Sequence, residues 1–134
     1  MRIESHRTLI GILREHFAEW RRAAGLSIAS AVDVVVKEHE LAGGPGATGI
    51  RFDAHTDEFQ RVKNNSDRVM RWLDDDTKDS NFLPANFVLS ILAGMPDDVR
   101  VQCLNDMLYR FGLCVHSLET AEEIGLGLAD VCAM

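Results

Sequence analysis

The sequence predicts an all-α protein, a bundle of five to six helices. Apolar residues recur at steps of three and four through most of the chain, and glycine and proline divide it into segments of helical length. A content of 46% apolar and 26% charged residues is typical of a globular domain. The 134 residues are enough to bury one core, and they contain no internal repeat.

The first expected helix covers about residues 5–24 and ends at Gly25. Its apolar stripe consists of Leu9, Leu13, Phe17 and Trp20. The second runs from Ser27 to about Gly43. Its expected inward residues are Ile28, Val32, Val35 and Val36. A strand is the competing interpretation of "VDVVVK" because β-branched residues favour strands, but no helix breaker interrupts the segment.

A glycine-rich run at residues 43–49 is expected to be a flexible loop. It is not followed by the Gly-Lys-Ser/Thr of a phosphate-binding loop. After it, Thr56 is expected to cap a short helix that extends to Val62, with Phe59 and Val62 facing inward. A turn at residues 64–66 then leads to a helix from Asp67 to about Asp75.

Two further helices are expected in the C-terminal half. Pro84 suits the first turn of one, which ends at Gly94, and Pro96 with two aspartates begins the next, which continues to Gly112. The final segment has a capping-box spacing at Thr120 and Glu123. Its apolar stripe consists of Ala121, Ile124, Leu128 and Val131. We therefore divide the chain into a helical domain, residues 1–112, and a tail or short oligomerisation helix, residues 113–134.

The charge is unevenly distributed along the chain. The net charge is −7, which argues against general affinity for nucleic acid. Between Gln60 and Trp72, however, four cations stand against one aspartate, which gives +3 and leaves −10 for the rest. This segregation indicates a basic surface on an acidic protein.

The basic segment has the features of a DNA-reading helix. If Ser66 is its N-cap, the cations lie opposite an apolar face, and the N-terminal end of such a helix enters the major groove. We expect phosphate contacts from Arg61, Lys63 and the free amides of the turn, and base contacts from Arg68 and Arg71. Asn64 or Asn65 would read adenine or bind phosphate. The alternative is an ordinary amphipathic helix with a solvated basic face.

Other chemistry finds little support in the residue pattern. The five histidines show no metal-ligand spacing, and no second pair accompanies Cys114 and His116. We expect Cys103, Cys114 and Cys132 to be reduced, the first two buried on a helix. Asp74, Asp75, Asp76 and Asp79 fit neither the calcium-loop pattern nor a known nuclease spacing for magnesium. The carboxylate run is expected to help end the helix before it, and a second hypothesis is that it also repels phosphate. No nucleophile and base can be paired, so we expect no enzyme and no cofactor.

One order of residues runs through about residues 56–111: Ser66, Val69, Arg71 and Trp72, then Pro84, Leu89 and Leu92, then Asp97, Asp98 and Val99. In this order the chain resembles prophage regulators of the CII type, especially the CII-like family known as YdaT. The resemblance implies an all-α helix–turn–helix or POU-like domain, sequence-specific DNA binding and oligomers built through a C-terminal helix. It also places five residues at the DNA: Asn65, Ser66, Asp67, Arg68 and Arg71. YdaT proteins are often labelled toxins, because their overproduction harms the host.

The sequence therefore predicts a transcription regulator of prophage origin that binds double-stranded DNA through a helix starting at Ser66. Two half-sites require two subunits, so we expect a homodimer or a higher homo-oligomer. No apolar run reaches membrane-spanning length and the N-terminus is too polar for a signal peptide, so the cytoplasm is the expected compartment. The rival hypothesis is a helical interaction module, or a host-directed toxin that acts through a protein partner.

Overall fold

A computed structural model describes residues 7–54, 56–123 and 125, and throughout this part the chain is helical, without a strand. The predicted all-α class is confirmed. The described part has seven α-helices, one more than the upper end of the expected range. Short helices form in the glycine-rich run and in the C-terminal segment, while the two helices expected between residues 56 and 75 are one. The helices are α1 (Leu9–Ala23), α2 (Ile28–Leu41), α3 (Gly44–Thr48), α4 (Glu58–Trp72), α5 (Val88–Gly94), α6 (Asp97–Leu108) and α7 (Leu118–Glu123), with 3-10 turns at Ala85–Phe87 and Tyr109–Phe111.

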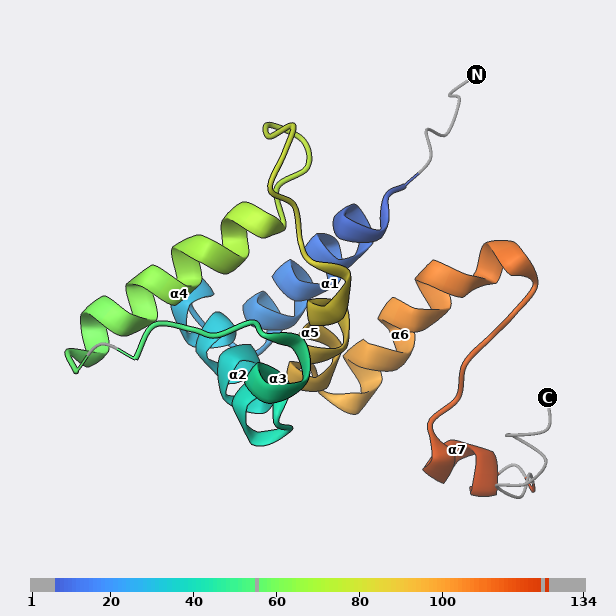
Figure 1. Ribbon diagram of the computed structural model, residues 1–134. Helices are drawn as coiled ribbons and strands as arrows, with labels where there is room; N and C mark the ends of the chain where they lie inside the picture. Colours follow the sequence, from blue (N-terminus) through green and yellow to red (C-terminus); the bar gives the residue numbers. More distant parts are fainter. Residues whose placement is uncertain (1–6, 55, 124, 126–134) are drawn as a thin grey trace.

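The helices pack around α2 and α5. α2 contacts both α4 and α5, while α6 packs on α1. Figure 1 shows α4 along one side of the molecule and α6 on the other, with α1, α2 and α5 between them. An extended segment carries α7 away from the end of α6 (Figure 1). One long face of α4 therefore has no helix packed on it in this view.

The core combines aliphatic side chains with an aromatic cluster. Phe87 lies at the centre of the cluster, with ring centroids 5.1 Å from His39, 5.3 Å from Phe52 and 5.3 Å from Trp72. These rings come from the 3-10 turn before α5, from α2, from the segment before α4 and from the end of α4, so one cluster joins four parts of the chain. The buried apolar residues are Ile12, Leu13, Phe17, Trp20, Ala31, Val32, Val35, Val36, Val69, Trp72, Leu73, Phe87, Ile91, Leu92, Met95 and Cys103.

Local sequence explains where the first two helices begin. The hydroxyl of Thr8 accepts a hydrogen bond from the Gly11 amide, and that of Ser27 accepts one from the Ser30 amide. Each satisfies an amide that the first turn leaves without a partner. "VDVVVK" is helical, so helix was the correct choice over strand. The expected first position Ser5 lies outside the described residues.

Two residues of the predicted apolar stripes are on the surface. Leu9 and Ile28, at the starts of α1 and α2, are exposed. Each lies near the end of its helix or on its outer side, where the neighbouring helix does not reach. Ile12, which is not in the predicted stripe, is buried instead.

The glycine-rich run is not wholly a loop. Pro45 opens the short helix α3, and glycines with φ of +75° stand at both of its ends, Gly43 and Gly49. A left-handed residue before and after the turn is favourable only for glycine, so the same residues that suggest a loop instead delimit one helical turn.

The C-terminal part begins differently from the prediction. Ser117, rather than Thr120, caps α7, because its hydroxyl accepts from the Thr120 amide at 3.1 Å. Cys114 is exposed and follows the last 3-10 turn, so the expectation that it is buried on a helix is wrong, whereas Cys103 is buried in α6 as expected. Cys132 and the stripe residues Ile124, Leu128 and Val131 lie outside the described residues, and the side chain of Ala121 is not described.

The close contact between α5 and α2 leaves no room for a side chain at Gly94. A Cβ at this position would lie 2.7 Å from Val35 Cγ2 and 3.1 Å from Val35 Cα. Gly94→Ala should therefore lower the free energy of unfolding by about 1–3 kcal/mol, measured by urea denaturation, although alanine has the better helix propensity. Gly46→Ala is the control, since nothing lies within 4 Å of its Cβ position. Equal stability of the two variants would contradict the close α2–α5 packing.

Candidate nucleic-acid interface

The basic segment forms a single helix. α4 runs unbroken from Glu58 to Trp72, so the expected turn at residues 64–66 and a helix start at Ser66 are wrong. Its N-cap is Asp57, whose carboxylate accepts from the amides of Phe59 and Gln60. Glu58–Trp72 therefore form one helix and not the helix–turn–helix that the resemblance implied, and no free amides of a first turn are available at Ser66 for phosphate.

Asn65 and Ser66 are buried, with exposed fractions of 3% and 8%. Asn65 Oδ1 accepts from the backbone amide of Asp53 at 3.0 Å. Asn65 and Ser66, whose sequence is typical of a turn, therefore face inward. There Asn65 provides the hydrogen-bond acceptor for a backbone amide of the segment before α4. Neither side chain lies on the surface that DNA contact requires.

Arg68 is engaged within the protein. Its guanidinium lies over the rings of Phe52, at 5.0 Å, and Trp72, at 4.7 Å, and donates a hydrogen bond to the carbonyl of Arg51. Guanidinium stacking on aromatic faces is favourable and orients the side chain. Arg68 thereby fastens residues 50–54 along α4, a role that charge patterning did not indicate.

The outward face of α4 is polar along its whole length. Its residues are related by helical steps of three and four, counted from Gln60 and from Asp67: Gln60, Lys63, Asn64, Asp67 and Arg71. Gln60 Nε2 donates to Asn64 Oδ1 at 2.7 Å, and Lys63 is 3.1 Å from the Asp67 carboxylate. The Arg71 side chain is exposed and makes no ion pair within the described part of the chain.

Two further features of this face bear on the prediction. Arg61 is half-buried, with its guanidinium 4.0 Å from the Glu58 carboxylate. Asn64 also donates to Asp53 at 2.7 Å, which ties the outward face to the segment before α4. Gln60 was not among the predicted site residues; its i, i+4 spacing to Asn64 would have placed it on the same face if α4 had been predicted as one helix.

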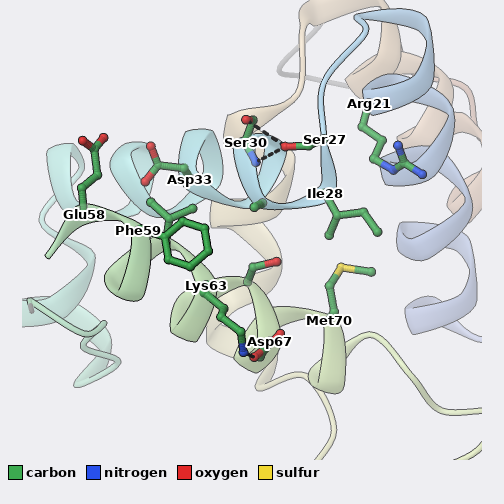
Figure 2. Close-up of a pocket in the computed structure, with 13 residues that line it drawn as sticks. Arg21, Ser27, Ile28, Ser30, Asp33, Glu58, Phe59, Lys63, Asp67 and Met70 are labelled. Carbon is green, nitrogen blue, oxygen red and sulfur yellow. Dashed lines mark hydrogen bonds and ion pairs between the residues drawn. The ribbon is translucent and has the colours of Figure 1, made fainter.

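An apolar groove borders this face. It runs between α4 and the start of α2, and Figure 2 shows Phe59, Lys63 and Met70 in order along α4, opposite Ser30 and Ile28. Phe59, expected inside the core, is 77% exposed. It lies in the first turn of α4, where no described helix covers it, so the expectation of an inward ring is wrong. The groove is lined by Arg21, Ser27, Ile28, Ala29, Ser30, Asp33, Glu58, Phe59, Val62, Lys63, Ser66, Asp67 and Met70.

The aspartate run anchors the end of α4 to α1. Arg14 donates to the carbonyl of Leu73, the C-cap of α4, and to Asp75 at 2.8 Å. The Arg14 guanidinium, together with the Thr8 hydroxyl, lowers the pKa of Asp75 below its usual value. Asp74 accepts from the amides of Asp76 and Thr77 in the turn that follows. Ending the helix, the first of the two predicted roles, is the one these contacts support.

Metal and nucleophile chemistry is not evident in the described residues. No three histidine, cysteine, aspartate or glutamate side chains come together there, while His6 and His55 lie outside them. Burial, and then the charge of Asp106, raise the pKa of the Cys103 thiol to about 11. A thiol with that pKa is protonated at neutral pH and a poor nucleophile. No described helix combines the length and apolar character that crossing a membrane requires.

These features define an all-α protein of acidic net charge in which α4 carries +2 and presents a polar face outward. A family model described as "Bacterial toxin ydaT" matches residues 12–127. The chain therefore belongs to the YdaT family, as the resemblance in its central part indicated. The match includes all of α2 to α7 and most of α1. No curated protein and no solved structure matches the chain.

The different surroundings of the two arginines predict different effects on stability. Arg68→Ala should lower the free energy of unfolding by about 1–3 kcal/mol, because it removes two ring contacts and a hydrogen bond. Arg68→Lys should recover only part of this loss, since an ammonium does not stack as a planar group. Arg71→Ala, on the exposed face, should change stability by no more than about 0.5 kcal/mol. Urea denaturation measures all three, and an effect of Arg71→Ala equal to that of Arg68→Ala would refute this assignment.

Proposed function

We propose that this YdaT-family protein is a sequence-specific DNA-binding regulator that reads the major groove with the outward face of α4. The observation that carries the proposal is the polar face of one long helix that no other described helix covers. An α-helix is the element that the major groove accepts, and its side chains, rather than its backbone, read base edges. The proposed function is the one that the sequence predicted, but the DNA-reading helix is α4 as a whole and not a helix that starts at Ser66.

The charge of α4 supports contact with a polyanion. Four cations and two carboxylates give the helix +2, whereas the whole chain carries −7 and the rest therefore −9. The other described faces are thus acidic on balance and disfavour DNA, so the duplex approaches α4 in preference to them. The same acidity keeps non-specific affinity low, because such affinity comes almost entirely from phosphate contacts.

The residue types on the face suit particular contacts. Amide side chains such as Gln60 and Asn64 pair with adenine edges, and Lys63 and Arg71 suit guanine edges or phosphates. Arg61 lies at the edge of the outward face, and its guanidinium would bind a phosphate of the DNA backbone. In this proposal Arg68 acts as a positioning residue, since its stacked guanidinium holds the segment beside α4 rather than a base.

Two subunits belong to the proposal as well. Dimeric regulators that place a helix in the major groove bind two half-sites related by the two-fold symmetry of the protein. The family description names a toxin; a regulator that is harmful when overproduced is consistent with that description. Action on DNA would take place in the cytoplasm, and the proposal requires neither catalysis nor a cofactor.

Selection from a pool of random duplexes, at low and at physiological salt, tests the proposal. The protein should enrich one motif, and its log affinity should fall linearly with log salt, with a slope of about −0.9 for each phosphate contacted. Lys63→Ala/Arg71→Ala should lose the enrichment and reduce that slope by up to about 2 per subunit.

The matched control removes two cations away from α4. Arg22 and Arg110 are exposed on α1 and on the 3-10 turn after α6. Arg22→Ala/Arg110→Ala changes the net charge by the same amount and should keep both the motif and most of the slope. If both double variants behave alike, the binding follows net charge and not α4; if the folded wild-type protein enriches no motif, the regulator is the wrong class.

A protein partner is the second candidate, and the apolar groove is the observation that favours it. The groove combines exposed apolar side chains, Ile28 and Phe59, with half-buried Val62 and Met70. If a protein bound in this groove, and not DNA, is the target, the same selection should find no DNA binding at any salt concentration, which separates the two candidates.

A further inference from the structure

We infer that Phe59 is a specificity-determining residue that contacts the methyl group of thymine in the operator. The inference rests on the proposed function, that α4 reads the major groove, and adds a base-specific contact that charge and hydrogen bonding do not supply. Thymine is the base that presents an apolar group in the major groove, and phenylalanine is among the side chains that contact it.

The position of Phe59 is the first observation. It lies in the first turn of α4, one residue before Gln60 on the outward face. Regulators that place a helix in the major groove use the N-terminal residues of that helix for base edges. The amides of Phe59 and Gln60 donate to the Asp57 carboxylate and are not available to a phosphate. A base at this end of the helix would therefore contact side chains, Phe59 among them.

The exposure of Phe59 is the second observation. At 77% it is the most exposed aromatic ring described in this chain, so the fold gains little from it. Figure 2 shows the ring above the Lys63 side chain, whose ammonium extends along α4 to Asp67, 3.1 Å away, so a cation lies further along the helix than the ring. Together they match the apolar methyl of thymine and the phosphates or acceptor edges around it.

Replacing thymine by deoxyuridine tests this contact directly. Deoxyuridine keeps every hydrogen-bonding group of thymine and lacks only the methyl. In the duplex that the protein selects, exchanging the contacted thymine should weaken wild-type binding about fourfold, the value of one buried methyl-sized group. Phe59→Ala should bind the thymine duplex correspondingly less tightly and bind both duplexes equally. Phe59→Leu should remain sensitive to the methyl.

Controls keep this inference separate from the proposed function. Leu89→Ala removes an equally exposed apolar side chain, on α5, and should leave both affinity and methyl sensitivity unchanged. The inference on Phe59 is overturned if the wild-type protein tolerates deoxyuridine at every thymine, or if Phe59→Ala keeps the same sensitivity. In either case, salt-dependent binding that Lys63→Ala/Arg71→Ala weakens would leave the proposed function standing. Absence of binding to any duplex overturns both.

Discussion

The packing of Phe52 against Phe87 and Trp72 is the contact on which the candidate interface depends. It brings the extended segment at residues 50–54 against the end of α4, and polar bonds then hold the segment in place. His39 Nε2 lies 2.9 Å from the carbonyl of Ile50, and Asn65 accepts from the amide of Asp53. With one flank of α4 covered in this way, and α2 packed beside it, the outward side of the helix and the groove beside the start of α2 remain open. The polar face is therefore a consequence of the core.

Charge has two separate uses in this molecule. Cations that serve the fold are engaged with specific partners: Arg14 with the end of α4, and Arg68 with two rings and a carbonyl. Cations that would serve a ligand are exposed, as Lys63 and Arg71 are. A surface ion pair such as that between Lys63 and Asp67 contributes little to stability, so it can be exchanged for a phosphate or a base at small cost. Basic residues that stand together in sequence thus divide between structure and binding.

Much of the fold could be predicted from the sequence because the signals were local. Helical periodicity and the caps at Ser27 and Pro96 placed α2 and α6 within a few residues, and Gly94 correctly marked the end of α5. The two 3-10 turns and the short α3 depend on a few backbone angles that composition does not specify. The charge segregation was also visible in advance, and it led to the helix that the structure presents on the surface.

The continuity of α4 could not be predicted from the sequence, which indicated a turn at residues 64–66, and the reason is physical. Asn64, Asn65 and Ser66 favour turns when their side chains bond to nearby backbone. Here Asn65 bonds to the amide of Asp53, twelve residues earlier, and Asn64 to the Asp53 side chain. Local propensity depends on neighbouring residues and therefore does not indicate a hydrogen-bond partner so distant in the chain. The same limitation explains why Phe59 was predicted to face inward. An apolar residue on a helix is expected in the core, and only the tertiary packing determines whether a neighbour covers it.

The most direct test of the central claim is to map which side chains DNA touches. In a titration of the ¹⁵N-labelled protein with duplex DNA at low salt, the side-chain amide signals of Gln60 and Asn64 should shift together with the backbone amides of α4. The side-chain amide of Gln102, exposed on α6, is the internal reference and should not move. Shifts centred on α6 and α7, with Gln60 and Asn64 unchanged, would contradict the claim that α4 is the DNA-reading helix.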